Sequence, residues 1–395
     1  MNNKSPRLVA LALLLFLPLL DAREPQTSPP PTQPAIRARA LGIPFDGTPG
    51  ALNAITDVAG VEVGYTTLIS GEGKLEVGKG PVRTGVTALL PRGRSSFDDP
   101  VYAGYFSLNG NGEMTGTAWI EESGFLEGPV MITNTHSVGV VRDATIAWRV
   151  AHGGPDPTSF SWSLPVVAET WDGYLNDING FHVKPEHVMN ALDTAKGGPV
   201  AEGSIGGGTG MVTYEFKGGN GTASRVLDKK NGGYVIGAFV QANCGRRGQL
   251  TIAGVPVGKE ITENAVYSKE AGSIIIVIAT DAPLLPHQLK RLARRASLGL
   301  ARTGSVSGNG SGDLFLAFST ANPHAADPAE PTRSVATVPN DRMDAIFTAT
   351  VQAVEEAIVN ALVANQSMTG RDGHHVDAMP HDRVREVMKK YNRAP

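Results

Sequence analysis

Near-continuous apolar runs recur along the chain and predict buried β-strands. The most uniform are residues 235–243, 274–279 and 314–318, in which few positions are polar. A strand of this kind needs cover on both faces, because neither face alternates between apolar and polar side chains. Shorter β-rich stretches at 60–65, 82–90 and 130–133 alternate with Gly-rich turns. We expect Pro91 to end the second of these stretches.

Three segments show the 3.6-residue period of amphipathic helices. They are residues 186–195, which follow Pro185, then 284–303, and finally 343–364. The middle one carries a cationic stripe opposite its apolar face, which we expect on a solvated or interface side. On the last helix we expect Glu355 and Glu356 to be solvated. Helices of this length alongside buried strands predict sheets stacked between helical layers.

The N-terminus has the pattern of a secretory signal. Lys4 and Arg7 precede an apolar stretch at 8–20, which is shorter than the ~20 residues that span a bilayer. We therefore expect a cleaved signal peptide over residues 1–22 and place the protein outside the cytoplasm, in the periplasm of a bacterium. A membrane anchor is the alternative. The Pro-rich residues 23–36 predict an extended linker, and residues 37–395 a single catalytic domain.

Composition excludes several functional classes. With 41% hydrophobic and 18% charged residues the chain can bury a sizeable core, and a net charge of −3 gives no electrostatic support for binding nucleic acid. The single cysteine, Cys244, excludes an intramolecular disulfide and a metal site with two thiolates. There is no His-Glu-x-x-His motif, and we expect His374, His375 and His381 in a solvated tail. No metal or cofactor is expected.

The candidate chemistry centres on Gly272-Ser273, at the mouth of the predicted strand 274–279. The Ser273 hydroxyl could attack the Gly272 carbonyl and cut the chain into fragments 37–272 and 273–395. Ser273 would then carry a nucleophilic oxygen and a free α-amine, which is the logic of N-terminal nucleophile catalysis. Such an amine has an ordinary pKa of about 7.7–8.0 and is partly neutral near physiological pH. On its own the dipeptide is more typical of a simple turn.

Other residues could support this chemistry. Ser311 and Asp313 lie two positions apart in a Gly-rich segment, so in an extended conformation they share one face. Asp313 could orient the Ser311 hydroxyl, which in turn would contact Ser273. Asn243, at the end of a buried strand, could donate to an oxyanion, and Glu169 could hold a substrate ammonium. Taken singly, these residues are equally compatible with a Gly-rich loop, a turn and a solvated carboxylate.

Six ordered segments resemble one family, the L-aminopeptidase/D-esterase and β-peptidyl aminopeptidase family, and the resemblance runs from about residue 40 to 371. They are residues 47–58, 134–139, 169–177, 241–245, 271–284 and 308–313. The resemblance implies an α/β (α+β) fold built as a four-layer αββα sandwich, similar in architecture to N-terminal nucleophile hydrolases but differently connected. It also implies a homotetramer of processed protomers.

The same resemblance assigns roles to single residues. Ser273 would be the nucleophile, Ser311 the assisting serine, Asp313 the acidic third member, Asn243 the oxyanion donor and Glu169 the ammonium ligand. Relatives can carry Glu at the position of Asp313 and a tyrosine near that of Trp171. Trp171 can donate only through its indole N–H, and Tyr174 is a possible substitute. We expect Asn134 to shape the substrate pocket.

These observations predict a secreted serine aminopeptidase that cuts itself at Gly272-Ser273. It would release N-terminal residues, by preference β-amino acids, from short peptides, amides or esters with a free amine, through an acyl-enzyme on Ser273. Both fragments would stay associated. One alternative is L-aminopeptidase or D-amidase specificity on the same fold. Others are a non-catalytic periplasmic binding protein and an uncut esterase acylated at Ser311.

Overall fold

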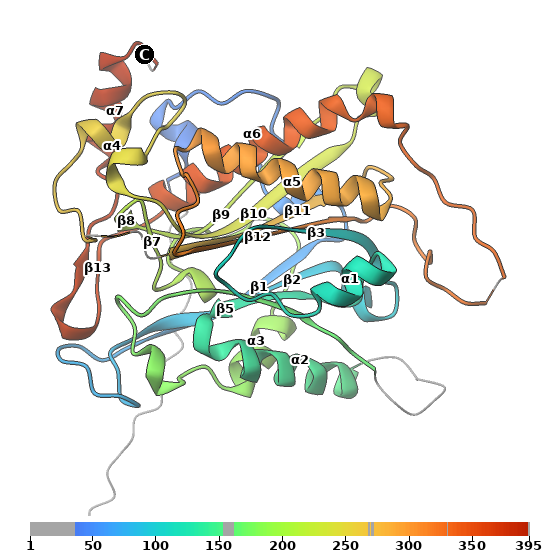
Figure 1. Cartoon of the computed structure of the whole chain (residues 1–395), viewed down its shortest axis with the longest axis horizontal. Helices are drawn as coiled ribbons and strands as arrows, with labels where there is room; N and C mark the ends of the chain where they lie inside the picture. Colours follow the sequence, from blue (N-terminus) through green and yellow to red (C-terminus); the bar gives the residue numbers. More distant parts are fainter. Residues whose placement is uncertain (1–35, 153–161, 268, 270–271, 330, 394–395) are drawn as a thin grey trace, which may run out of the picture.

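A computed structural model describes residues 36–152, 162–267, 269, 272–329 and 331–393. The predicted signal peptide and all but the last residue of the predicted linker lie outside these ranges. Helices and strands within them stack in four layers (Figure 1). This is the αββα arrangement that the family resemblance implies.

Two sheets form the middle layers. The first has the order β1-β2-β5-β6 and the second the order β4-β3-β12-β11-β10-β9. The strands of the first sheet are β1 (Glu62–Ser70), β2 (Val82–Arg94), β5 (Val130–Asn134) and β6 (Val166–Thr170). Those of the second are β3 (Val101–Gly110), β4 (Phe125–Leu126), β9 (Gly219–Val226), β10 (Val235–Asn243), β11 (Gly272–Thr280) and β12 (Ser311–Ser319).

Helices cover the outer face of each sheet. Helices α2 (Val138–His152) and α3 (Pro185–Asp193) pack on the first sheet, and α5 (Pro286–Arg302) and α6 (Asp344–Val363) pack on the second (Figure 1). The smaller elements are the helices α1 (Thr117–Ser123), α4 (Val257–Glu260) and α7 (His381–Lys390), and two hairpins. The hairpins pair β7 (Val212–Thr213) with β8 (Phe216–Lys217), and β13 (Met368–Thr369) with β14 (His375–Val376).

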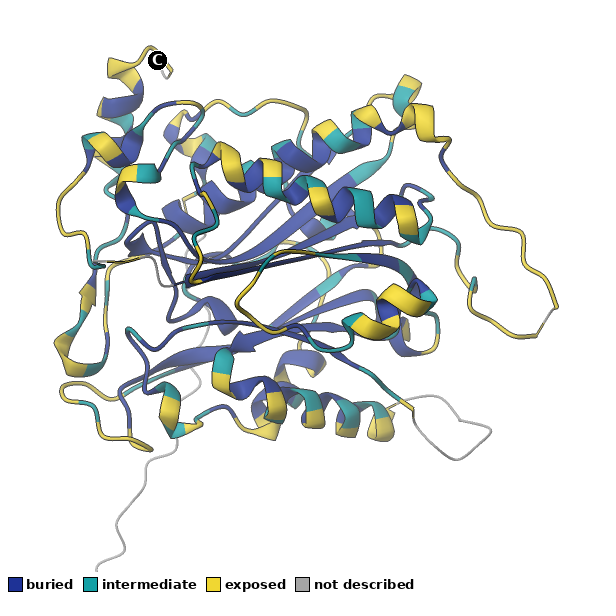
Figure 2. Cartoon of the chain, viewed as in Figure 1, coloured by how far each residue is buried: buried dark blue, intermediate teal, exposed yellow. Residues whose placement is uncertain are grey.

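The apolar strand β11 lies in the centre of the second sheet, and its two faces enter different cores. Ile274, Ile276 and Ile278 belong to the core under α5 and α6, whereas Ile275 and Val277 belong to the core between the sheets. Because both faces are covered, no polar position is needed from 274 to 279, and Figure 2 shows these inner layers as buried. The predicted strands and the three predicted helices are confirmed, with ends shifted by a few residues.

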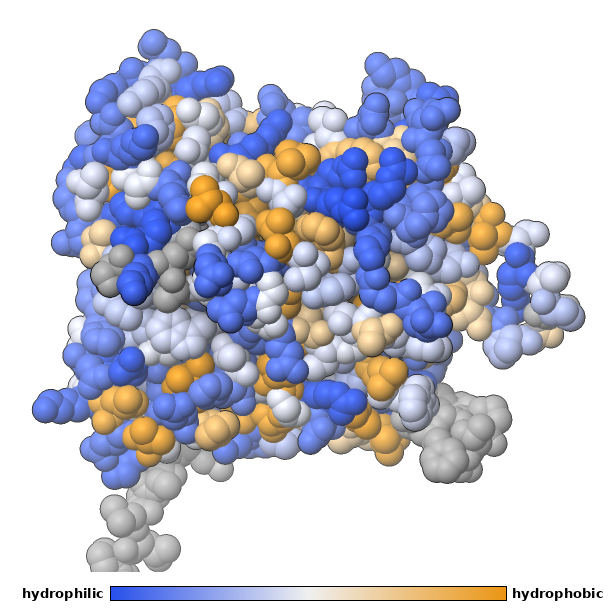
Figure 3. Space-filling model, in the orientation of Figure 1, coloured by the Kyte–Doolittle hydropathy of each residue, from blue (hydrophilic) through white to orange (hydrophobic). Residues whose placement is uncertain are grey.

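The cationic stripe of α5 faces outward, as expected. Arg291 and Arg295 lie over the ring of Phe347, and Arg294 lies over that of Phe106. Hydrophilic side chains accordingly gather over α5 on the surface in Figure 3. Within the described residues α6 is the one helix long and apolar enough to cross a membrane, and 78% of its apolar window is buried inside the fold.

Three expectations were wrong. Strand β2 continues to Arg94 instead of ending at Pro91; its ladders stop at Leu90, so the missing N–H of Pro91 breaks no pairing. Glu356 is fully buried and pairs with Arg39 and with Arg225, so it is not solvated.

The third concerns the C-terminal segment, which is not a solvated tail. His381 begins helix α7 and its Nε2 lies 2.8 Å from the carbonyl oxygen of Val363. The apolar side of α7, with Val384, Val387 and Met388, is buried in the main core. Val384 and Met388 are four positions apart, the spacing that places side chains on one face of a helix.

Candidate active site

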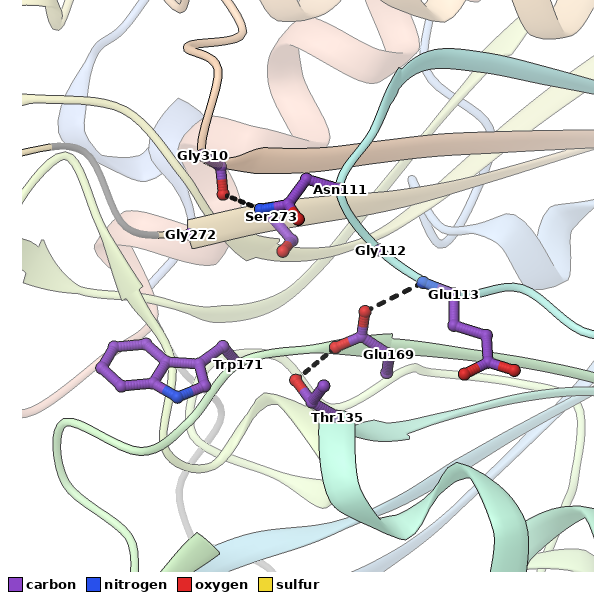
Figure 4. Close-up of a pocket in the computed structure, with 9 residues that line it drawn as sticks. All are labelled: Asn111, Gly112, Glu113, Thr135, Glu169, Trp171, Gly272, Ser273 and Gly310. Carbon is purple, nitrogen blue, oxygen red and sulfur yellow. Dashed lines mark hydrogen bonds between the residues drawn. The ribbon is translucent and has the colours of Figure 1, made fainter.

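A cavity of about 470 Å³ opens at the N-terminal end of β11 (Figure 4). Strands and loops of both sheets line it, and no lysine or arginine is among the lining residues. These are Asn111, Gly112, Glu113, Thr135, Glu169, Trp171, Gly272, Ser273 and Gly310. Four residues expected to be functional, Gly272, Ser273, Glu169 and Trp171, are thus brought together from two segments about a hundred residues apart.

Ser273 is held between two neighbouring strands. Its partner in β10 is Asn243 and its partner in β12 is Gly312. Side chains alternate along a strand, so Ser273 shares the face of Ile275 and points between the sheets, where the cavity lies. A Cβ atom on Gly272 would lie 1.8 Å from the carbonyl oxygen of Asn243, so only glycine fits before Ser273.

Ser311 and Asp313 form the pair that their spacing predicts. The Ser311 hydroxyl donates to Asp313 Oδ1 at 2.7 Å, and both side chains are completely buried. Burial raises the pKa of the Asp313 carboxyl, and the neighbouring Ser307 and Ser311 oppose the rise. Among the described residues the carboxylate is hydrogen-bonded by the Ser311 hydroxyl and forms no ion pair.

The expected contact between the hydroxyls of Ser311 and Ser273 is not present among the described residues. Ser311 is the strand partner of Gly272, so its side chain lies on the helix-covered face of the sheet. Ser273 points to the opposite face. The neighbour of Ser311 across the ladder is Gly272, whose peptide bond to Ser273 contains the nitrogen that would become the α-amine.

Asn243 ties the end of β10 to the loop after β6. Its Nδ2 donates to the Trp171 carbonyl oxygen at 2.7 Å, and its Oδ1 accepts from the Val212 N–H at 2.7 Å. A side-chain amide has two N–H donors. One remains after the bond to Trp171, next to the strand position of Ser273.

Glu169 is a buried carboxylate without a basic partner in the described part of the chain. It is 3% exposed; Oε2 accepts from the Thr135 hydroxyl and Oε1 accepts from the Glu113 N–H at 3.0 Å. Burial raises the pKa of Glu169, while these two hydrogen bonds lower it. Its carboxylate lies across the cavity from Ser273 (Figure 4). This carboxylate faces the cavity and could pair with a cationic group there.

Sequence reasoning missed the loop after β3. Asn109 and Asn111 donate to the carbonyl oxygens of Gly308 and Gly310, at 2.7 and 2.8 Å. At its other end the Glu113 N–H donates to Glu169. The loop therefore connects the segment before Ser311 with Glu169. The run Asn-Gly-Asn-Gly-Glu at 109–113 was a signal, because it mirrors the Gly-rich run at 308–313.

Of the remaining three expected site residues, one lines the cavity and two lie outside its lining. Trp171 lines the cavity, but in Figure 4 its indole nitrogen lies on the edge of the ring away from Ser273. Tyr174 stacks on His374 and is not among the lining residues. Asn134, also outside the lining, donates to the Thr84 hydroxyl and accepts from the His136 N–H, so it supports the neighbouring Thr135.

This geometry can be compared with known proteins. The model of peptidase family S58 matches residues 53–376. The chain belongs to peptidase family S58. It is a serine aminopeptidase, a hydrolase of peptides or amides, and the described residues contain no group of three or more His, Cys, Asp or Glu that could hold a metal ion.

Individual members of the S58 family are close in sequence and in structure. β-Peptidyl aminopeptidase BapA of Sphingosinicella microcystinivorans is 57% identical, over 90% of this chain and 93% of that protein. L-aminopeptidase D-Ala-esterase/amidase of Ochrobactrum anthropi, described as a variant of the Ntn-hydrolase fold, is 51% identical with a TM-score of 0.85. The match covers 91% of this chain and 99% of that one.

A third relative is a β-aminopeptidase from a Burkholderia species. It is 49% identical with a TM-score of 0.83, over 90% of this chain and 99% of that one. The chain thus has the family and the fold that its six motifs predicted.

Proposed function

We propose that this S58 peptidase cuts itself between Gly272 and Ser273 and then releases N-terminal β-amino acid residues from short peptides or amides. The observation that carries the proposal is the placement of Ser273 across one cavity from Glu169. A serine at a strand end can act as the nucleophile, and a buried carboxylate with no basic partner among the described residues can take the substrate ammonium.

Self-cleavage needs only groups of the chain and one water. The Ser273 hydroxyl oxygen attacks the carbonyl carbon of Gly272, the C–N bond breaks, and its nitrogen takes the hydroxyl proton. The acyl group then sits on Ser273 as an ester beside the new α-amine. Water hydrolyses this ester, which leaves a carboxylate at Gly272 and a free hydroxyl at Ser273.

Turnover repeats the same attack on a substrate. Glu169 holds the substrate ammonium, and the Ser273 hydroxyl adds to the substrate carbonyl while the Ser273 α-amine takes its proton. The second N–H of Asn243 donates to the oxyanion, a role commonly worth roughly 3–4 kcal/mol of barrier. The proton passes to the leaving amine, and water then hydrolyses the acyl-enzyme.

The pair Ser311 and Asp313 acts through the α-amine. The nitrogen of residue 273 lies in the backbone of β11, next to Ser311 in β12. A Ser311 hydroxyl oriented by Asp313 can hold this amine with its lone pair towards the Ser273 hydroxyl. Asp313 therefore serves as an electrostatic support for the protonated amine during attack.

Two fragments of a cut chain would stay together, because the sheet joins them. Strand β11 of the small fragment pairs along its length with β10 of the large one, and β12 pairs with β3. We also propose export to the periplasm after loss of residues 1–22, and a homotetramer. Export rests on the sequence pattern and the tetramer on the family resemblance; fractionation and light scattering would test them.

The β-residue preference rests on the names of the relatives. The Sphingosinicella enzyme is named a β-peptidyl aminopeptidase and the Burkholderia enzyme a β-aminopeptidase, whereas the Ochrobactrum enzyme, at 51% identity, is named an L-aminopeptidase and D-Ala-esterase/amidase. That second specificity is the alternative. Turnover of matched β-homoalanine, L-alanine and D-alanine p-nitroanilides, with the N-acetylated forms as controls, separates the two.

Intact-mass spectrometry with N-terminal sequencing tests self-cleavage. We expect two species, the smaller spanning 273–395 and beginning Ser-Ile-Ile-Ile. Ser273→Ala should remain one inactive chain, whereas an active or processed Ser273→Ala protein contradicts the mechanism. An uncut wild-type chain that labels at Ser311 supports the esterase alternative, and one that resists serine reagents supports a binding protein.

A further inference from the structure

The chain segment that leads to the proposed scissile bond is held by arginine side chains. We call residues 261–267 the processing arm; it follows α4, has no strand or helix pairing, and ends five residues before Gly272. Arg246 Nη2 donates to the Tyr267 carbonyl oxygen at 2.8 Å. Arg247 Nη1 donates to the carbonyl oxygens of Glu263 at 2.6 Å and of Ile261 at 3.3 Å.

Both arginines are themselves fixed by the turn between β7 and β8. Arg246 Nε pairs with the Glu215 carboxylate, whose side chain is fully buried. Arg247 donates to the carbonyl oxygens of Tyr214 and Glu215 at 3.0 and 2.6 Å, and its guanidinium lies 3.4 Å from the centre of the Phe216 ring. Arg247 is only 4% exposed. Each guanidinium therefore bridges the turn to the processing arm with little freedom of its own.

The origin of the two arginines makes this bridge relevant to self-cleavage. They follow Asn243 directly after strand β10, and Asn243 is the strand partner of Ser273. One short segment thus contacts Ser273 through the β-ladder and the processing arm through the guanidinium groups.

Attack by a neighbouring group is efficient only when the reacting atoms are held about 3–3.5 Å apart, and a misplacement of about 1 Å can cost about a hundredfold in rate. The Gly272 carbonyl carbon is such an atom. Gly272 is the first residue of β11, where it pairs with Ser311, and Tyr267 lies five residues before it in the sequence. An arm released from the arginines would add freedom to the chain just before this strand end.

We infer that Arg246 and Arg247 are positioning residues for self-cleavage that are not needed for turnover once the chain is cut. The inference rests on the proposed self-processing. Neither arginine lines the cavity, and neither exchanges a proton or forms a bond in the reaction. Their contribution is to keep the arm in one place before the bond breaks.

Arg246 is the better residue for a test, because about a third of its side chain is exposed, whereas Arg247 is buried. Arg246→Gln removes the ion pair with Glu215. Arg246→Lys keeps the charge, but a lysine lacks the planar fork that reaches Glu215 and Tyr267 together. The matched control is Arg385→Gln, a surface arginine paired with Asp382 on α7.

Each full-length variant is made by cell-free synthesis, and the uncut fraction is followed with time by gel and intact mass. After completion, kcat, KM and the melting temperature are measured. We expect the half-time of cutting to lengthen about tenfold in Arg246→Gln, less in Arg246→Lys and not in the control. In the completed enzymes kcat and KM should stay within about twofold of wild type.

The alternatives give different results. Arg246→Gln cutting at the wild-type rate overturns the inference, and so does a variant in which cutting, kcat and melting temperature all fall together. A wild-type chain that never cuts contradicts self-processing itself, and with it any role of Arg246. If Arg246→Gln fails to fold, Arg246→Lys and Glu215→Gln carry the test, because both keep the buried turn filled.

Discussion

Asn243 and Ser273 lie directly opposite each other in the antiparallel strands β10 and β11. The Asn243 side chain also binds the Trp171 carbonyl and the Val212 N–H, so it joins a strand end, a cavity wall and the β7–β8 hairpin. A residue fixed on three sides is well suited to stabilise charge at a neighbouring hydroxyl, since it needs no reorganisation when the charge develops.

Replacing Asn243 by alanine should lower kcat about a hundredfold with a smaller change in KM, because an oxyanion donor acts mainly in the transition state. Asn243→Asp should be at least as slow, since a carboxylate repels the oxyanion. Steady-state kinetics on fully processed enzyme would measure both. A kcat within about twofold of wild type in Asn243→Ala would remove the residue from the oxyanion site.

Removal of the Ser311 hydroxyl should slow turnover about tenfold or more and cost about 1–3 kcal/mol of unfolding free energy. The stability loss follows because the buried Asp313 carboxylate loses a hydrogen bond. Asp313→Asn retains a hydrogen-bonding group without the charge, so it should lose rate with less loss of stability. Denaturant unfolding and kcat, measured on both variants, separate the two effects. Equal kcat in wild type and Ser311→Ala would count against its proposed role.

Thr135→Val tests whether the Thr135 hydroxyl positions the Glu169 carboxylate. Valine has nearly the shape of threonine but cannot donate to Glu169 Oε2. Because a hydrogen bond to a charged group contributes about 1.5–3 kcal/mol, we expect KM to rise about tenfold with kcat changed less. Thr145→Val is the control, as its hydroxyl bonds only the Val141 carbonyl within helix α2. A similar KM in both variants would show that Thr135 does not position the carboxylate.

Two groups should shape the acid side of the pH profile of kcat/KM: the Ser273 α-amine, which must be neutral to take a proton, and Glu169, which must be ionised to bind the ammonium. Burial raises the pKa of Glu169 above the ordinary value of 4.5, so its contribution is present above the raised pKa and is lost as the pH drops through it. Thr135→Val removes a hydrogen bond that lowers this pKa, and it should move the acid limb to higher pH. An acid limb that does not move would assign it to another group.

Lys217 predicts a pH dependence of stability. It is fully buried, its amine donates to the Met211 and Gly218 carbonyl oxygens, and burial lowers its pKa to about 7 from 10.5. Between pH 7 and pH 10.5 the unfolded chain binds one more proton than the folded chain, so the unfolding free energy rises with pH. Below pH 7 both states carry the proton, and the loss of unfolding free energy caused by burying the charged amine is constant.

Lys217→Met should remove this contribution. From about pH 7 to about pH 9.5 the unfolding free energy of wild type should rise more than that of the variant, by about 1 kcal/mol or more. Urea titrations at the two pH values measure the difference. Parallel changes in the two proteins would mean that Lys217 keeps its charge when folded.

Two features of the site were predictable because they depend only on neighbouring residues in the sequence. A two-residue spacing in an extended segment placed Ser311 beside Asp313, and the apolar run after Ser273 required a central strand. Glu356 was misjudged because its partners, Arg39 and Arg225, are more than a hundred residues away in the sequence. The spacing of apolar residues along one helix cannot show that a glutamate has partners so far away in the sequence.

The sequence alone determined the layers, the identity of the motif residues and the family, since these follow from side-chain period, residue type and order. Only the tertiary structure decided that Ser311 and Ser273 occupy opposite faces of one sheet, because that depends on the register between β11 and β12. It also decided the contacts of Thr135, of Glu113 and of the two arginines that follow Asn243 in the sequence. These contacts join segments that come together only when the chain folds.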